Sequence, residues 1–157
     1  MNIPKTLSQL DGLCSAGYAI ALHVRYTAPK FLFQTYPADW MEIYSQKGLV
    51  LKDPTVLWGF ENTGTARWGE LVNQDEGGVL EIASRFGLKH GFSAAVNRGE
   101  ARSIASFARS DNDFSDAEIV EISDIFGELH DYFSEIEEIS AAEQAKLKEM
   151  SIAFTRG

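Results

Sequence analysis

Residues 36–44 of the chain read Tyr36-Pro37-Ala38-Asp39-Trp40-Met41-Glu42-Ile43-Tyr44. Pro37 suits the first turn of a helix, where its missing N–H costs nothing, and Gly48 suits the position just past the end. In such a helix Tyr36 at the entry, Trp40 and Tyr44 are four residues apart and share one face. This face would carry two phenol O–H groups and one indole N–H on large apolar bodies.

Asp53 follows one short loop later and directly precedes Pro54. One interpretation is an N-cap followed by proline at the first helical position. A second is a buried carboxylate that accepts an N–H from a ligand amide in a charge-assisted bond. A carboxylate has several acceptor sites, so both roles can hold at once. Asp53 and the three donors together indicate a pocket for a small, mostly apolar molecule with a polar head.

An ordinary structural explanation of the aromatic residues stays open at this level. Trp40 and Trp68 could be core residues whose N–H groups meet backbone oxygens. Tyr36 and Tyr44 carry the same ambiguity, because tyrosines at helix ends are often half exposed. The pocket is therefore a hypothesis about where these donors point.

Composition indicates one globular domain over residues 1–157, with 45% hydrophobic residues and no composition shift that marks a boundary. No apolar run is long enough to span a membrane, and the N-terminus lacks a signal-peptide pattern, so we expect a cytoplasmic protein that does not contact membranes. The single cysteine, Cys14, excludes a disulfide framework and a cysteine-based zinc site. The three histidines, at positions 23, 90 and 130, show no metal-ligand spacing.

The net charge of −9, with an acidic run over 111–138 that contains no Lys or Arg, predicts weak nucleic-acid binding by this chain alone. Gly-rich phosphate loops, nucleophile elbows, HExxH and Cys–His constellations are absent from the sequence. We therefore expect a protein that is not an enzyme, with no catalytic residues, no metal and no cofactor.

Hydrophobic periodicity predicts an α+β fold with helices packed on an antiparallel sheet. Ser115 and Glu118 form a capping box that opens a long amphipathic helix. Residues 59–69 lack periodicity and are expected to be irregular, and 141–157 are polar and helix-prone. The expected helices are 3–14, 37–48, a short one from 54, 79–86 and 115–139, and the expected strands are 18–26, 31–35, 91–97 and 102–107.

The aromatic and aspartate spacings over residues 36–68, the Asp53-Pro54-Thr55-Val56 segment and residues 87–93 resemble the autoinducer-binding domain of the LuxR family of quorum-sensing transcriptional regulators. The resemblance covers most of the chain. It implies an α-β-α sandwich with a central five-stranded antiparallel sheet and an N-acyl-homoserine lactone buried between sheet and helices. Thr65-Ala66-Arg67 departs from the pattern, because many members carry a proline near this point.

The resemblance also implies a role for each candidate ligand-binding residue. Trp40 would donate to the lactone carbonyl and Tyr36 to the acyl carbonyl, while Asp53 would accept the amide N–H. Trp68 and Tyr44 would wall the lactone and the acyl chain. Strand 102–107 would line the pocket through alternate residues, so that Ser103 or Ala105 would lie beside the acyl chain.

Regulators of this family continue into a C-terminal helix-turn-helix, which is absent from these 157 residues. We expect a ligand-sensing domain that signals as a homodimer, through the N-terminal helix and helix 115–139, with DNA contacted only by a domain not present here. Two alternatives stay open. The domain could act free-standing, by pairing with or inhibiting a full-length regulator, or it could sense a ligand other than an acyl-homoserine lactone.

Overall fold

The computed structural model describes residues 1–25, 28–135 and 148–149. Its centre is a five-stranded sheet in the order β2-β1-β5-β4-β3, in which every neighbouring pair is antiparallel. The strands are β1 (Gly17–Arg25), β2 (Ala28–Gln34), β3 (Gly64–Arg67), β4 (His90–Arg98) and β5 (Ala101–Arg109). The α+β class and the five-stranded antiparallel sheet are thus confirmed.

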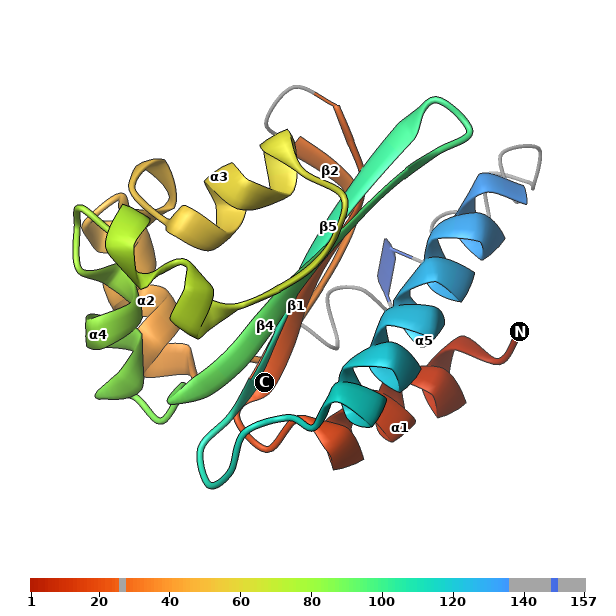
Figure 1. Ribbon diagram of the computed structural model, residues 1–157. Helices are drawn as coiled ribbons and strands as arrows, with labels where there is room; N and C mark the ends of the chain where they lie inside the picture. The colour runs from red at the N-terminus through yellow and green to blue at the C-terminus, as the bar shows by residue number, and fades with distance from the viewer. Residues whose placement is uncertain (26–27, 136–147, 150–157) are drawn as a thin grey trace.

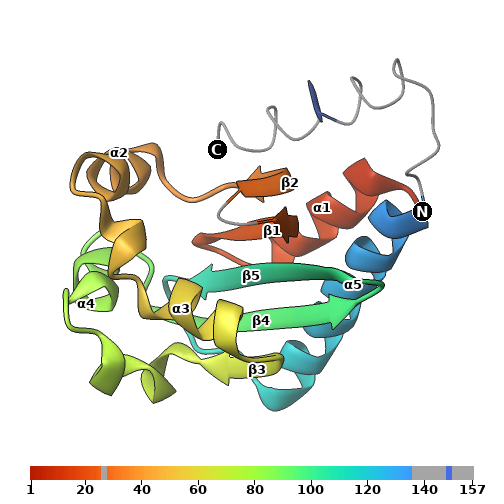
Figure 2. The same cartoon turned by 90° about the horizontal axis from the view of Figure 1, so that it is seen from above.

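Helices cover both faces of this sheet (Figures 1 and 2). One face carries α1 (Ile3–Leu13) and α5 (Asp116–Glu135), and the other carries α2 (Ala38–Gln46), α3 (Pro54–Glu61) and α4 (Val79–Ser84). Short 3₁₀ turns at Leu49–Leu51, Trp68–Glu70 and Val72–Gln74 connect the second group. The architecture is the α-β-α sandwich expected from the resemblance.

The two faces of the sheet carry side chains of very different size. Toward α1 and α5, large apolar residues form a closed core that includes Tyr18, Ile20, Phe33, Phe92, Phe107 and Phe126. Toward α2–α4, the central strands present mainly small side chains, among them Ala19, Ala21 and Ser106. Small side chains leave space between this face and the helices above it.

Two glycines allow elements on the helical side to approach the sheet closely. A Cβ at Gly59 of α3 would lie 2.4 Å from Ile104 Cγ2 on β5, and a Cβ at Gly91 of β4 would lie 2.4 Å from Trp68 Cδ2. Both distances are far inside van der Waals contact. Glycine therefore fixes how closely α3 and the Trp68 indole lie over the sheet.

The sequence misjudged two segments. The strand expected over 31–35 begins earlier, at Ala28, and ends at Gln34. Residues 59–69, expected to be irregular, contain the end of α3, the edge strand β3 and the turn that begins at Trp68. β3 is only four residues long and alternates weakly, and its pairing with β4 supplies the stability that its own pattern lacks. Residues 136–139 of the expected long helix, and 141–157 apart from 148–149, lie outside the described residues.

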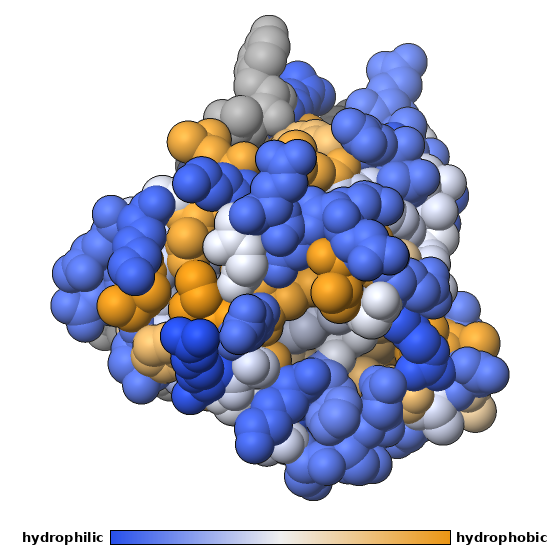
Figure 3. Space-filling view, turned by 60° about the vertical axis from the view of Figure 1, so that its left-hand side comes forward, coloured by the Kyte–Doolittle hydropathy of each residue, from blue (hydrophilic) through white to orange (hydrophobic). Residues whose placement is uncertain are grey.

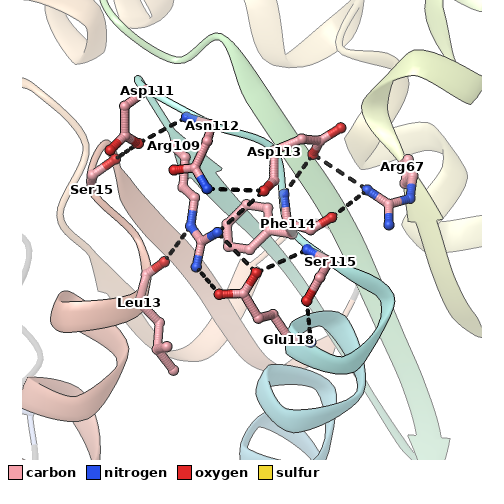
Figure 4. Close-up of polar contacts among 10 residues, drawn as sticks. All are labelled: Leu13, Ser15, Arg67, Arg109, Asp111, Asn112, Asp113, Phe114, Ser115 and Glu118. Carbon is pink, nitrogen blue, oxygen red and sulfur yellow. Dashed lines mark hydrogen bonds and ion pairs between the residues drawn. The ribbon is translucent and has the colours of Figure 1, made fainter.

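The start of α5 is tied to the sheet by Arg109 (Figure 4). The guanidinium donates to both carboxylate oxygens of Glu118, at 3.1 and 2.6 Å, and to the Leu13 carbonyl at 2.8 Å. It also lies 4.2 Å from the centre of the Phe114 ring. The capping box is confirmed, because the Ser115 N–H donates to Glu118 and the Glu118 N–H donates to the Ser115 hydroxyl.

This ion pair predicts a pH dependence of stability. The hydrogen bonds from Arg109 hold the pKa of Glu118 at about 2, below its ordinary value of 4.5. Because the folded pKa is depressed, the stabilisation is fully present above pH 4.5 and is lost as the pH falls toward 2. Glu118→Gln should lower the urea midpoint at neutral pH and flatten its decline through this window.

Glu121→Gln, at an exposed position of the same helix, is the control and should keep the wild-type decline. An equally steep loss of stability in Glu118→Gln would show that the pair contributes nothing in this pH window.

Candidate ligand-binding site

A cavity of about 710 Å³ lies between the sheet and the helices α2, α3 and α4. Its floor comes from β1, β2 and β5, and its roof comes from the three helices and the Leu49–Leu51 turn. The lining is mostly apolar, with a few polar side chains directed inward. Volume and lining are those of a small-molecule site.

Asp53 is the buried acceptor of this cavity. Its Oδ1 accepts the Thr55 N–H at 2.9 Å and the Thr55 hydroxyl at 2.7 Å, and its Oδ2 accepts the Tyr44 hydroxyl at 2.8 Å. The side chain therefore caps α3 as expected and keeps acceptor capacity on Oδ2. Burial raises the pKa of Asp53 above its ordinary value, and the bonds from Thr55 and Tyr44 oppose this rise.

Two buried donors border the same cavity without a partner among the described residues. The Tyr36 hydroxyl is fully enclosed and unpaired, and burial together with the nearby Asp53 charge raises its pKa. The Ser106 hydroxyl opposes this rise, although no hydrogen bond of ordinary geometry joins the two groups. The Trp40 side chain is 3% exposed, and its indole N–H meets no acceptor in the described part of the chain.

Aromatic packing holds Trp40 in place. Its ring meets Tyr44 edge-on, with centroids 5.5 Å apart, and lies 5.6 Å from Phe86. Tyr44 is in turn fixed by its bond to Asp53. The acceptor and one donor are thus positioned by a single aromatic cluster from α2 and the turn that follows α4.

Trp68 borders the cavity with its ring, while its N–H is already bonded. The indole donates to the Ser93 hydroxyl at 3.2 Å, and the Ser93 and Ser106 hydroxyls are 2.6 Å apart. The indole N–H of Trp68 is thus satisfied within the protein, although by a serine hydroxyl and not by a backbone oxygen as the alternative from sequence had it. The Trp68 ring therefore forms part of the cavity wall, and its N–H is not free to bind a ligand.

The expected position of Ser103 was wrong. Its side chain lies on the opposite face of the sheet, where its hydroxyl accepts the His23 backbone N–H at 3.0 Å and bonds His130 Nδ1 at 2.6 Å. Ala105 borders the cavity, but its register partners Ile20 and Ala94 belong to the core beneath α1 and α5. The cause is a one-residue phase error, since the alternation of a strand sends residues 104 and 106 to the cavity.

The buried histidines explain why Ser103 faces α5. His130 Nε2 donates to the Arg98 carbonyl at 3.0 Å, and His23 Nε2 lies 3.0 Å from the His130 carbonyl. The two rings are 4.7 Å apart. Burial lowers the pKa of His130, which favours the neutral ring that accepts from Ser103. This network joins α5 to the sheet and lies away from the cavity.

Ile104, Ser106 and Gln34 are among the lining residues that sequence reasoning missed. For Gln34 a signal existed. Phe31 and Phe33 alternate with Leu32 and Gln34 along β2, and both phenylalanines enter the closed core. Leu32 and Gln34 must then face the other way.

The cavity opens to solvent through an apolar rim. This rim consists of Leu51, Leu57 and Phe60, which line the cavity and whose exposed fractions are 83%, 49% and 39%. In the view that brings the α2–α4 side forward, hydrophobic patches interrupt a mostly polar surface (Figure 3). An apolar chain could extend to this rim.

No cluster of three or more His, Cys, Asp or Glu side chains suited to a metal ion occurs among the described residues. None of the described helices combines the length and the hydropathy needed to cross a membrane.

Comparison with known proteins identifies the class. The family model described as "Autoinducer binding domain" matches residues 11–134, so the chain belongs to this family of ligand-sensing domains of transcription regulators. The transcriptional activator SolR of Ralstonia nicotianae is 29% identical over 111 residues, which make up 70% of this chain and 47% of SolR. The chain therefore spans about half the length of this curated relative.

Solved structures share the fold at low identity. Escherichia coli SdiA superposes with a TM-score of 0.63 at 19% identity, over 88% of this chain and 64% of that chain. CepR2 of Burkholderia cenocepacia, described as N-acylhomoserine lactone dependent, gives 0.59 at 17% identity, over 81% and 77%. SdiA in complex with octanoyl-rac-glycerol gives 0.60 at 18% identity, over 80% and 56%.

The two serines of β5 should respond differently to mutation. Ser103→Ala leaves the His23 N–H and His130 Nδ1 unpaired in a buried site and should lower the free energy of unfolding by about 1–3 kcal/mol, measured by urea denaturation. Binding of a ligand in the cavity should not change. Ser8→Ala, at an exposed position of α1, is the control for serine removal. A loss of ligand affinity with unchanged stability in Ser103→Ala would restore Ser103 to the site.

Proposed function

We propose that the cavity binds an N-acyl-homoserine lactone. The observation that carries this proposal is the combination, in an apolar space, of one buried carboxylate, the unpaired buried Tyr36 hydroxyl and the Trp40 indole N–H, which meets no acceptor among the described residues. Such a ligand has one amide N–H, which needs an acceptor, and two carbonyls, which each need a donor. Its acyl chain needs only apolar wall, at about 0.8 kcal/mol per buried methylene.

Each polar group of the ligand has a partner in this arrangement. Asp53 accepts the amide N–H on Oδ2 and thereby offsets part of the cost of burying its charge. Tyr36 donates to the acyl carbonyl and Trp40 to the lactone carbonyl. Trp68 and Tyr44 form the wall around the head group, and the acyl chain runs over Ile104 toward the apolar rim.

We further propose that the domain is the cytoplasmic sensor part of a LuxR-type quorum-sensing regulator and signals as a homodimer. Membership of the family and the likeness to the activator SolR support this role. DNA would be contacted through a separate helix-turn-helix domain, because this acidic chain lacks the positive charge that phosphate binding needs. Pairing with another regulator remains the alternative for the output.

A second ligand class follows from one relative. SdiA is described in complex with octanoyl-rac-glycerol, an ester with an acyl chain and free hydroxyls. A glycerol hydroxyl could donate to Asp53 in place of the amide N–H. We therefore include 1-octanoylglycerol as a competing probe.

Binding should be visible as thermal stabilisation. N-octanoyl-homoserine lactone should raise the melting temperature of the wild-type protein in a dose-dependent way, because it binds only the folded state. Asp53→Asn keeps the cap on Thr55 but removes the charged acceptor, and should weaken binding about tenfold or more. Trp40→Phe keeps the ring and should weaken binding by about two- to tenfold.

Trp58→Phe is the matched control, because Trp58 is half-buried on α3 and is absent from the cavity lining. It should leave the ligand-induced shift unchanged. If lactones of short, medium and long chain all fail to shift the melting temperature while 1-octanoylglycerol succeeds, the ligand assignment moves to acyl esters. If neither class shifts it, the proposed binding function is wrong.

A further inference from the structure

Gln34 is a buried amide with no assigned role. It is the last residue of β2, it is 5% exposed, and it lines the cavity. Its side chain forms no hydrogen bond with any residue that the structure describes. A glutamine amide offers two donors and a carbonyl acceptor, and buried groups of this kind are normally paired.

The position of Gln34 on the sheet places it beside the polar end of the cavity. In the strand register Gln34 lies opposite Ala19, and Ala19 lies opposite Ser106. Strands are 4.7–4.9 Å apart, so the backbones at Gln34 and Ser106 are separated by about 10 Å with only the Ala19 methyl between them. The gap is wide enough for a ligand chain to pass between two polar groups.

The same residue is close in sequence to a proposed carbonyl donor. Gln34 is two residues from Tyr36, which corresponds to about 7 Å along an extended chain. A ligand whose acyl carbonyl meets Tyr36 would therefore pass Gln34 with the first carbons of its chain. A long, flexible amide side chain can reach an atom there.

Selectivity follows from what the ligand must displace. In the free protein, water in the cavity can pair with the amide. A purely apolar chain would remove this water and leave Gln34 unpaired, which costs affinity, whereas a chain with its own oxygen would replace the lost bonds. Sites with a buried polar group discriminate strongly against ligands that lack the complementary group.

We propose that Gln34 is a specificity-determining residue that selects ligands whose acyl chain carries a hydrogen-bonding oxygen, a carbonyl or a hydroxyl, near the amide. The proposal rests on the lactone-binding function proposed above and names the subclass of ligand. The amide serves both kinds of oxygen, because its NH₂ group donates to a carbonyl and its own carbonyl accepts from a hydroxyl.

The test compares three ligands of equal chain length by isothermal titration: N-octanoyl-, N-(3-oxooctanoyl)- and N-(3-hydroxyoctanoyl)-homoserine lactone. Wild-type protein should bind at least one oxygenated ligand about tenfold more tightly than the plain one. Gln34→Met, which keeps the length of the side chain without its polar atoms, should bring this ratio close to one and leave binding of the plain ligand equal or stronger.

Gln74→Met is the matched control, because Gln74 is exposed and is absent from the cavity lining. It should keep the wild-type ratio. Gln34→Ala replaces Gln34→Met, with the same criteria, if the latter does not fold.

Three results would overturn the proposal. If wild-type protein binds the three lactones equally, or if the preference survives in Gln34→Met, Gln34 does not select the ligand, and the lactone-binding function still stands. If none of the three lactones binds to wild-type protein, and their shorter- and longer-chain counterparts do not bind either, the proposed function fails and this inference fails with it.

Discussion

A charged carboxylate inside an apolar space is the constraint on which the site depends. Asp53 is 8% exposed, and it is held there by three hydrogen bonds, two from Thr55 and one from Tyr44. These bonds offset part of the desolvation cost, and the pKa of the carboxyl nevertheless remains raised. The protein therefore maintains an acceptor that a ligand N–H would stabilise further, which is the property expected of a pre-organised amide site.

The space around this acceptor results from the two unequal faces of one sheet. Phe33, Phe92 and Phe107 fill the face beneath α1 and α5, and this closed core supplies the stability of the fold. On the other face, the small side chains of Ala19, Ala21 and Ser106 leave space for the cavity above the sheet. An apolar chain of the right shape would complete the second core, so binding and folding are expected to be linked.

Local sequence signals predicted much of this arrangement. Pro37 and Gly48 bracket α2, Asp53-Pro54 opens α3, and the capping box opens α5, because each signal acts on backbone groups within a few residues. The phase of β5 was not predictable in this way. Residues 103–107 are small or apolar on both faces, so tertiary packing decides which side faces the cavity. Phe107 lies in the closed core, and Ser103, on the same face of the strand, bonds His23 of β1 and His130 of α5. The edge strand β3 depends on β4 in the same non-local manner.

The central claim is that the Trp40 indole N–H, which has no acceptor among the described residues, donates to a ligand carbonyl beside Asp53. Nuclear magnetic resonance can test this claim directly. In a ¹H–¹⁵N spectrum recorded during titration with N-octanoyl-homoserine lactone, the indole resonance assigned to Trp40 by its loss in Trp40→Phe should move downfield. The Trp58 indole resonance should stay in place. A lactone that binds while the Trp40 resonance does not move would contradict this account.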